Sequence, residues 1–128
     1  MKKIGICNIA DLEDGIVPKK WGSELIIHNG EDYCGKVLKF NAGAEFSMHF
    51  HMKKSETWFV AKGEFLLKWI DPEDASEHQK VLRYCDVIEI PQGQPHQLPT
   101  FTGGDIFEVS TPHFDDDSYR IKKGDSQK

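Results

Sequence analysis

The sequence predicts an all-β fold built from two facing sheets. Short apolar runs recur along the chain, and turn signals rich in Gly, Asn, Asp and Pro separate them about every 8 to 12 residues. No amphipathic helical pattern of useful length interrupts these runs. Several of them alternate polar and apolar side chains, as a half-buried strand requires. Many short antiparallel strands of this kind are typical of a double-sheet barrel or sandwich.

The expected elements follow the chain in order. Residues 1–18 are expected to form an N-terminal edge segment with a short strand and a loop. Strands are then expected around residues 25–27, 33–40, 45–51, 56–61, 65–70, 81–84, 87–90 and 106–109. The charged segment 71–80 begins with Asp-Pro and is expected to be an exposed hairpin loop. Residues 19–112 would thus form the barrel, and residues 113–128 a polar tail that frays at its end.

The bulk composition is that of a soluble globular protein. The chain has 128 residues, 29% of them charged, and a net charge of -5, which argues against binding to a nucleic-acid backbone. Its start lacks the features of a secretory signal, and no run of apolar residues is long enough to span a bilayer. Cys7, Cys34 and Cys85 are odd in number and widely spaced, which suits reduced thiols. We therefore expect a cytoplasmic protein.

Two histidines in a β-forming stretch begin a candidate metal site. His49 and His51 are separated by one residue, so a period of two directs both side chains to one face. Glu56 follows five residues later, beside an apolar run, and Gly63 supplies the turn into the next run. A carboxylate is therefore expected to enter the site from the strand after the histidines.

A third imidazole follows a later strand. Pro91, Gly93 and His96 come directly after the apolar segment 87–90. Three neutral imidazoles and one carboxylate oxygen suit a borderline divalent cation such as Zn, Mn, Fe, Ni or Co. The predicted ligands of one such ion are His49, His51, Glu56 and His96. Because an imidazole must be neutral to coordinate a metal, we expect occupancy to fall below about pH 6.

The histidine strand has one polar and one apolar face. Its odd positions from Glu45 to His51 are polar and its even positions are apolar. In a barrel that holds a metal, the polar face can line a pocket. Glu45 is therefore a candidate general base, and Glu108 is a second candidate. The remaining histidines are interpreted as surface or packing residues: His28, His78 and His113.

These residues resemble the two motifs of the cupin superfamily. The spacing from Gly43 through both histidines and Glu56 to Gly63 is that of the first motif. The spacing from Pro91 to His96 is that of the second motif. The resemblance implies a cupin double-stranded β-helix, which is a jelly-roll barrel, as a single domain over residues 1–128.

The flanking residues give a weaker and finer resemblance. Residues 21–24 and 107–109 look like those of small cupins related to the mannose-6-phosphate isomerase domain of bifunctional mannose enzymes, and the similarity covers roughly residues 17–112. Four positions depart from the patterns. Cys85 stands where a cupin glycine is expected, and Thr100 where an asparagine is often found. His49 stands where the finer group often has glutamine, and Lys54 where it usually has arginine.

This resemblance implies a metal-dependent isomerase acting on a sugar or a sugar phosphate. The metal would polarise a carbonyl or hydroxyl group while a base moves a proton between adjacent carbons. Two alternatives stay open: an Fe(II)-dependent dioxygenase, and a cupin that binds a sugar or another small molecule without chemistry. We expect no nucleic-acid or membrane partner. We also expect a homodimer, because several strands have apolar residues on both faces and because Ile4, Ile6 and Ile9 lie near the N-terminus.

Overall fold

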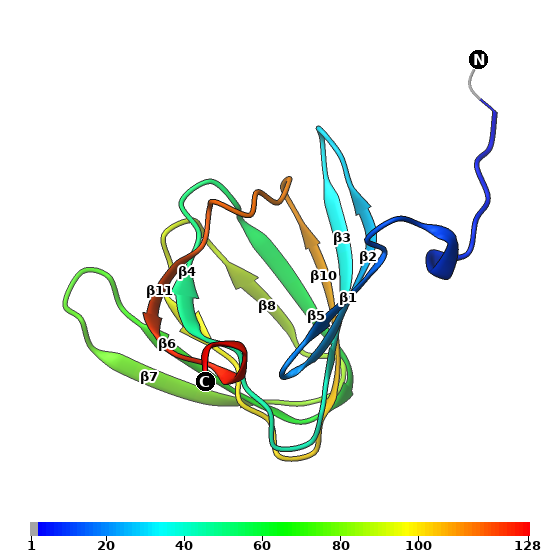
Figure 1. Cartoon of the computed structure of the whole chain (residues 1–128). Helices are drawn as coiled ribbons and strands as arrows, with labels where there is room; N and C mark the ends of the chain where they lie inside the picture. Colours follow the sequence, from blue (N-terminus) through cyan, green and yellow to red (C-terminus); the bar gives the residue numbers. More distant parts are fainter. Residues whose placement is uncertain (1–2) are drawn as a thin grey trace.

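A computed structural model of the chain describes residues 3–128 as two antiparallel sheets that face each other (Figure 1). One sheet has the order β1 (Ile16–Lys19), β2 (Gly22–Asn29), β3 (Cys34–Phe40), β10 (Gly104–Ser110), β5 (Glu56–Gly63) and β8 (Val87–Ile90). The other has the order β11 (Tyr119–Lys122), β4 (Met48–Phe50), β9 (His96–Gln97), β6 (Phe65–Ile70) and β7 (Glu77–Leu82). Two short 3-10 helices, η1 (Ile9–Asp11) and η2 (Asp125–Gln127), complete the described elements. The predicted all-β fold is confirmed.

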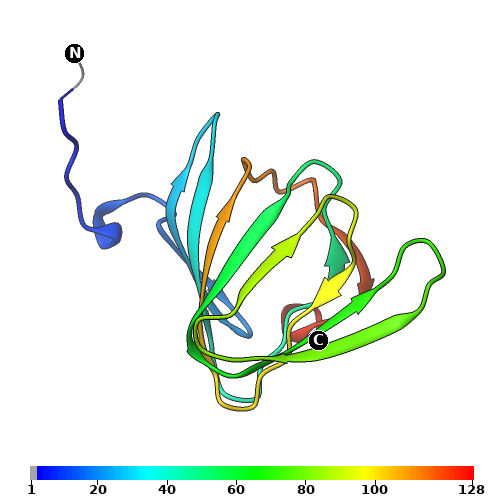
Figure 2. The same cartoon turned by 180° about the vertical axis from the view of Figure 1, so that it is seen from behind.

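The chain crosses repeatedly between the two sheets. From β3 onward, successive strands change sheet except at the β6–β7 hairpin, so β10 returns to pair with both β3 and β5. Seen from behind, the strands form an open-ended barrel wall (Figure 2). This winding is the jelly roll implied by the sequence motifs. It pairs β4 with β9, which is far from it in the sequence, while β5 follows β4 directly along the chain in the facing sheet.

The inner face of the six-stranded sheet changes from polar to apolar along its strands. Three successive cross-strand rows are Cys34–Ser110–Glu56, Lys36–Glu108–Trp58 and Leu38–Ile106–Val60. The third row belongs to the buried apolar core, whereas the first two carry most of the polar side chains. Alternate residues of a strand face the same side, so the change from polar to apolar side chains follows from the sequences of β3, β5 and β10. One end of the barrel is therefore a packed core and the other is available for a site.

An aromatic cluster joins the core to that polar end. Trp21 stacks on Phe40 with ring centroids 4.6 Å apart, and Phe46 packs against both. The Phe46 ring also lies 5.0 Å from the ring of His49 and 6.0 Å from that of His96. Buried aromatic pairs of this kind contribute about 0.5–1.5 kcal/mol beyond the area they bury. His49 and His96 therefore pack against this aromatic cluster.

Three segments differ from the sequence predictions. Residues 77–80 were expected in a loop but belong to β7, an edge strand whose first five residues are all exposed. An edge strand buries little, so the apolar alternation that identifies strands is missing there. No strand was expected in the polar tail, yet residues 119–122 form β11, which pairs with β4. The histidine strand was expected from Glu45, but its ladder begins only at Met48.

Two turns at motif positions have a left-handed backbone conformation, one with glycine and one without. Gly63 has a φ of 83°, and a Cβ there would lie 2.0 Å from the carbonyl oxygen of Gly103, so a side chain cannot be accommodated. Cys85, which replaces the expected glycine, keeps the left-handed conformation with a φ of 74°. Its amide donates to the carbonyl of Val60 at 2.9 Å. The turn before β8 is thus preserved without glycine.

The N-terminal segment extends away from the barrel (Figure 1). Residues 3–8 are all exposed, and Ile4 and Ile6 are 90% and 92% exposed. Among the described residues 3–128, no helix has the length and apolar character needed to cross a membrane.

Candidate metal centre

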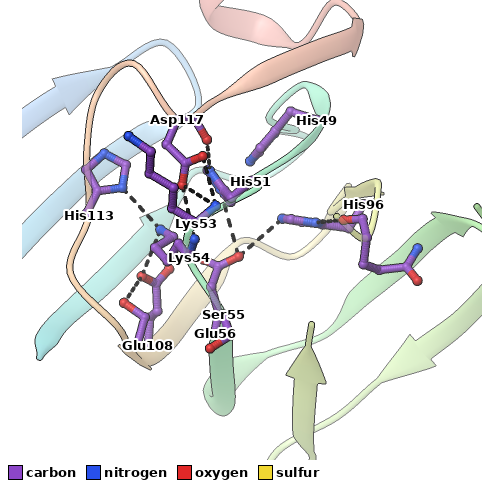
Figure 3. A network of polar contacts seen from close by, with 12 residues as sticks. His49, His51, Lys53, Lys54, Ser55, Glu56, His96, Glu108, His113 and Asp117 are labelled. Carbon is purple, nitrogen blue, oxygen red and sulfur yellow. Dashed lines mark hydrogen bonds and ion pairs between the residues drawn. The ribbon is translucent and has the colours of Figure 1, made fainter. Parts of the chain in front are cut away.

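Three of the predicted ligands come together at the polar end of the barrel. His49 lies on β4 and His96 on β9, where they are direct cross-strand partners, and His51 follows the end of β4. One ring nitrogen from each lies within 4.8 Å of the others, and the group could hold a metal ion. The three side chains converge with that of Glu56 (Figure 3). They line a hollow of about 580 Å³.

Backbone carbonyls fix the tautomer of each imidazole. His49 Nδ1 lies 2.7 Å from the carbonyl oxygen of Ser47, and His96 Nδ1 lies 2.8 Å from that of Gln94. His51 Nδ1 lies 2.7 Å from the carbonyl oxygen of Asp117. A carbonyl can only accept, so each Nδ1 carries the proton and each Nε2 presents a lone pair. A hydrogen bond from Nδ1 to a carbonyl in this way orients the ring of a histidine that binds a metal through Nε2.

Burial keeps the three imidazoles neutral. It is the largest cause that lowers the pKa of His51 and of His96 to about 4, and the positive charge of Lys54 acts in the same direction. The pKa of His49 is lowered well below its usual range, by burial and by the neighbouring histidines. Neutral Nε2 atoms in a hollow are lone-pair donors for a cation.

Glu56 completes the convergence with a carboxylate on β5. Its Oε2 atom lies 3.5 Å from His96 Nε2 and 3.9 Å from His51 Nε2. Among residues 3–128, Glu56 Oε2 and His96 Nε2 are both buried without a hydrogen-bond partner. Neither an unprotonated Nε2 nor a carboxylate oxygen can donate, so these lone pairs face one another uncompensated. A bound cation would satisfy all of them, and the donor set therefore fits a divalent metal ion.

Asp117 supports His51 from the C-terminal segment. Its buried carboxylate accepts hydrogen bonds from the backbone amides of Met52, Lys53 and Lys54 at 2.9–3.1 Å. Burial alone would raise the pKa of Asp117, but these hydrogen bonds outweigh it and the pKa is lowered. Its carbonyl orients His51 at the same time. Asp117 therefore fixes both the turn after β4 and the orientation of a candidate metal ligand.

A buried ammonium connects Glu56 to Glu108. Lys54 Nζ lies 3.2 Å from Glu56 Oε1, 3.3 Å from Glu108 Oε2 and 3.2 Å from His113 Nδ1. Burial acts to lower the pKa of Lys54, but the charges of both carboxylates outweigh it and the pKa is raised. The pKa of Glu108 is raised, first by burial and then by the charge of Glu56. Lys54 holds Glu56 by one oxygen, and this leaves the other oxygen facing the histidines.

The two candidate bases occupy different places. Glu108 is 2% exposed and lines the hollow, where Ser110 Oγ donates to its Oε2 at 3.2 Å. Glu45 lies outside it: its carboxylate pairs with Lys128 at 3.4 Å and lines a separate surface hollow beside β6 and β7. The structure therefore does not bring Glu45 to the histidines. The reason is that residues 44–47 lie outside the β4 ladder, so the alternation of that strand does not extend back to Glu45.

Sequence reasoning missed several residues of the site. His113 was interpreted as a surface or packing histidine, yet it contacts the Lys54 ammonium inside the hollow. Asp117 lies in a run of three aspartates that looked like a solvated tail, and no local signal distinguishes it. The inward position of Lys36 could have been predicted, because it lies on the same face of its strand as the core residues Leu38 and Phe40.

Fold and site together define a double-sheet barrel with a histidine-rich centre at one end. A sequence model of the family described as Cupin matches residues 23–111 of this chain. The chain belongs to the cupin family.

Solved structures and one curated sequence give further similarity. The capsular polysaccharide assembling protein CapF from Staphylococcus aureus superposes with a TM-score of 0.72 at 19% identity, over 84% of this chain and 34% of that chain. Oxalate decarboxylase from Bacillus subtilis superposes with a TM-score of 0.75 at 15% identity, over 93% and 33%. Mannose-1-phosphate guanylyltransferase of Salmonella muenchen is 33% identical over 45 residues, which is 35% of this chain and 10% of that protein. The chain thus spans about a third of these solved chains and a tenth of the transferase, and the structural likeness shows the fold alone.

Metal retention is expected to persist to lower pH than the unperturbed histidine pKa suggests. Protons compete with the metal for Nε2, and the competition begins only as pH falls toward the pKa of the ring. Because the pKa values of His51 and His96 are about 4 rather than 6.5, we expect bound metal to be retained at pH 6 and lost below about pH 5. Metal content after equilibration at stepwise lower pH measures this. Half-loss at or above pH 6 would contradict the buried, neutral state of the rings.

Proposed function

We propose that this cupin binds one divalent metal ion through His49, His51, His96 and Glu56 and isomerises an aldose to a ketose at that centre. The observation that carries the proposal is the convergence of three imidazoles with one carboxylate, in which His96 Nε2 and Glu56 Oε2 are buried without a hydrogen-bond partner among residues 3–128. When bound, such an ion polarises the carbonyl or hydroxyl oxygens of a sugar. The barrel wall around the ligands leaves a hollow of about 580 Å³ for a small molecule.

Residues of this chain supply the proton transfer in the proposal. Glu108 faces the hollow from β10 and would take a proton from one carbon and return it to the next. Lys54 lies between Glu108 and Glu56 and holds both carboxylates in place. Phe46 and Trp58 form apolar walls that limit access of water. The short similarity to a transferase of mannose 1-phosphate supports a carbohydrate as the substrate class.

Deuterium exchange tests the reaction. Protein purified without chelator would be incubated in D₂O with a panel of aldoses and aldose 6-phosphates, and the products followed by NMR. Isomerisation through proton transfer predicts a ketose product with deuterium incorporated at the carbon next to the carbonyl. Turnover of a substrate with oxygen uptake by the Fe(II) form would favour the dioxygenase alternative instead. Saturable sugar binding with neither signal would favour a non-catalytic binding protein.

We also propose that the protein is a homodimer. A continuous row of apolar side chains crosses the outer face of the six-stranded sheet in register. It comprises Ile16, Leu25, Val37, Phe107, Phe59 and Val87. The side chains of this apolar row are half-buried or exposed. The N-terminal segment, which carries Ile4 and Ile6, is a second exposed apolar feature. A second copy would cover both features, because a two-fold axis lets the same surface pack against itself.

Light scattering at micromolar concentration measures the association. We expect a mass of about 29 kDa, twice the chain mass of 14.6 kDa. Phe107→Lys places a charge in the middle of the apolar row and is expected to give the monomer mass. Phe101→Lys is the matched control, because Phe101 is 93% exposed in a loop outside the row. A wild-type mass near 14.6 kDa would refute the dimer.

The three cysteines are free, and two of them, Cys7 and Cys85, are exposed. Exposed free thiols suit a reducing compartment, and we propose the cytoplasm as the place of action.

A further inference from the structure

Lys36 is a buried cation on the inner wall of the hollow. It lies on β3, is 2% exposed, and contributes to the lining of the same space as the histidines. Its in-register neighbour on β10 is Glu108. Lys36 therefore lies one strand away from the candidate base, in the cross-strand row directly above the apolar core.

The ammonium of Lys36 has unused hydrogen-bonding capacity. Its ion pair is with Glu24 Oε2 at 3.7 Å, which is longer than a hydrogen bond. Within residues 3–128, Lys36 Nζ makes no hydrogen bond, although an ammonium has three donors. Lys54 Nζ, by contrast, has three partners within 3.3 Å. Because Lys36 lines the hollow, its unused donors are open to the anionic group of a ligand.

The charge balance of the hollow changes when a metal binds. Its inner part is faced by two ammonium groups, Lys36 and Lys54, and by three carboxylates, Glu24, Glu56 and Glu108. The group alone carries one excess negative charge, so a divalent cation at the proposed centre would leave one excess positive charge. Lys54 already contacts two of the carboxylates directly. Lys19 and Arg120 also line the hollow, but both are exposed, so Lys36 is the buried cation that remains to attract an anion.

We propose that Lys36 is the anion subsite of the hollow and binds the carboxylate or phosphate of the substrate. Glu24, whose side chain is 20% exposed, can turn toward solvent when the ligand anion takes its place beside Lys36. This inference rests on the proposed function, because it assigns a substrate class to the same site. The class is a sugar that carries an acidic group, with its carbonyl end toward the histidines and its anionic end toward β3.

Calorimetric titration with three probes that share one ring tests the subsite. Glucose is neutral, glucuronate carries a carboxylate, and glucose 6-phosphate carries a phosphate. Wild-type protein of measured metal content is expected to bind at least one anionic probe about tenfold to a hundredfold more tightly than glucose, since a hydrogen bond to a charged group is worth that much in affinity. Lys36→Met is expected to abolish the preference, and Lys36→Arg, which restores the charge, to retain it.

The matched control is Lys39→Met. Lys39 lies on the same strand but faces outward, where it pairs with Asp105 at 3.3 Å, and its loss is expected to leave all three affinities unchanged. The relative affinity of glucuronate and glucose 6-phosphate distinguishes a carboxylate from a phosphate ligand. Equal binding of the three probes by the wild type, binding of none, or a preference that survives in a folded Lys36→Met protein would overturn the inference. The titration measures equilibrium binding and does not require turnover. The anion subsite can therefore be supported or refuted even if the protein is not an isomerase.

Discussion

His96→Ala and His51→Ala proteins are expected to lose their bound metal while they stay folded. Each substitution removes one of the Nε2 atoms that converge with Glu56 Oε2. Replacing a residue that only hydrogen-bonds to a metal ligand costs about 10- to 100-fold in metal affinity. Loss of the ligand itself should cost at least as much. Elemental analysis of protein purified without chelator or a nickel column measures the metal. Circular dichroism and thermal unfolding report whether the barrel persists.

His78→Ala is the matched control for this experiment. His78 lies on the edge strand β7, where it stacks on Trp69 and contacts Ser76. Its replacement is expected to leave the metal content unchanged. If the His51→Ala and His96→Ala proteins fold and keep a full complement of metal, the ligand assignment is wrong. Loss of metal in the His78→Ala protein would place the ion elsewhere.

Glu108→Gln is expected to lower isomerase turnover by about 10²- to 10⁴-fold, which is the usual contribution of a general base. Glutamine keeps the size of the side chain and its contact with Ser110, but it cannot accept a proton. Metal content should stay intact, because Glu108 contacts Lys54 and is not in the histidine group. The quantity to measure is the rate of deuterium incorporation next to the carbonyl, together with the metal content of the same sample.

Glu45→Gln serves as the control for Glu108→Gln. Glu45 is the same residue type and was the first candidate base named from the sequence, but its carboxylate pairs with Lys128 in a separate hollow. We expect its turnover to equal that of the wild type. If Glu45→Gln slows the reaction as much as Glu108→Gln, the loss of turnover reflects a change in structure, and Glu108 is not the general base. If neither variant changes the rate, proton transfer by a carboxylate should be abandoned.

The sequence alone predicted the parts of the molecule that depend on local patterns. The spacing of His49, His51 and His96 between β-forming runs predicted the histidine cluster, because strand period and turn position decide where such side chains point. The fold class followed from the density of short strands and turns. The assignment of Glu56 as the fourth ligand remains a prediction, with its Oε2 within 4 Å of two of the three imidazoles.

The parts that could not be predicted depend on contacts between distant segments. Asp117 is buried because β11 pairs with β4, and nothing in an aspartate-rich tail indicates that pairing. Glu45 was misplaced because the alternation was extended beyond the true start of β4. Lys36 could have been found from its strand parity, but parity does not say whether an inward lysine meets a carboxylate or an open hollow. That distinction requires β3, β10 and β2 to be placed beside one another.

The carbonyl of Asp117 that orients His51 lies 66 residues further along the chain. The loop between them must close before His51 is locked in the tautomer that binds a metal, and closure of long loops is slow compared with local structure formation. A partly folded chain would therefore have its histidines but not their orientation. At the proposed centre, metal uptake would be a late event in folding, and a metal that binds only the folded barrel would stabilise it by mass action. The segment before the last strand would thus determine when the folded barrel becomes able to bind its metal.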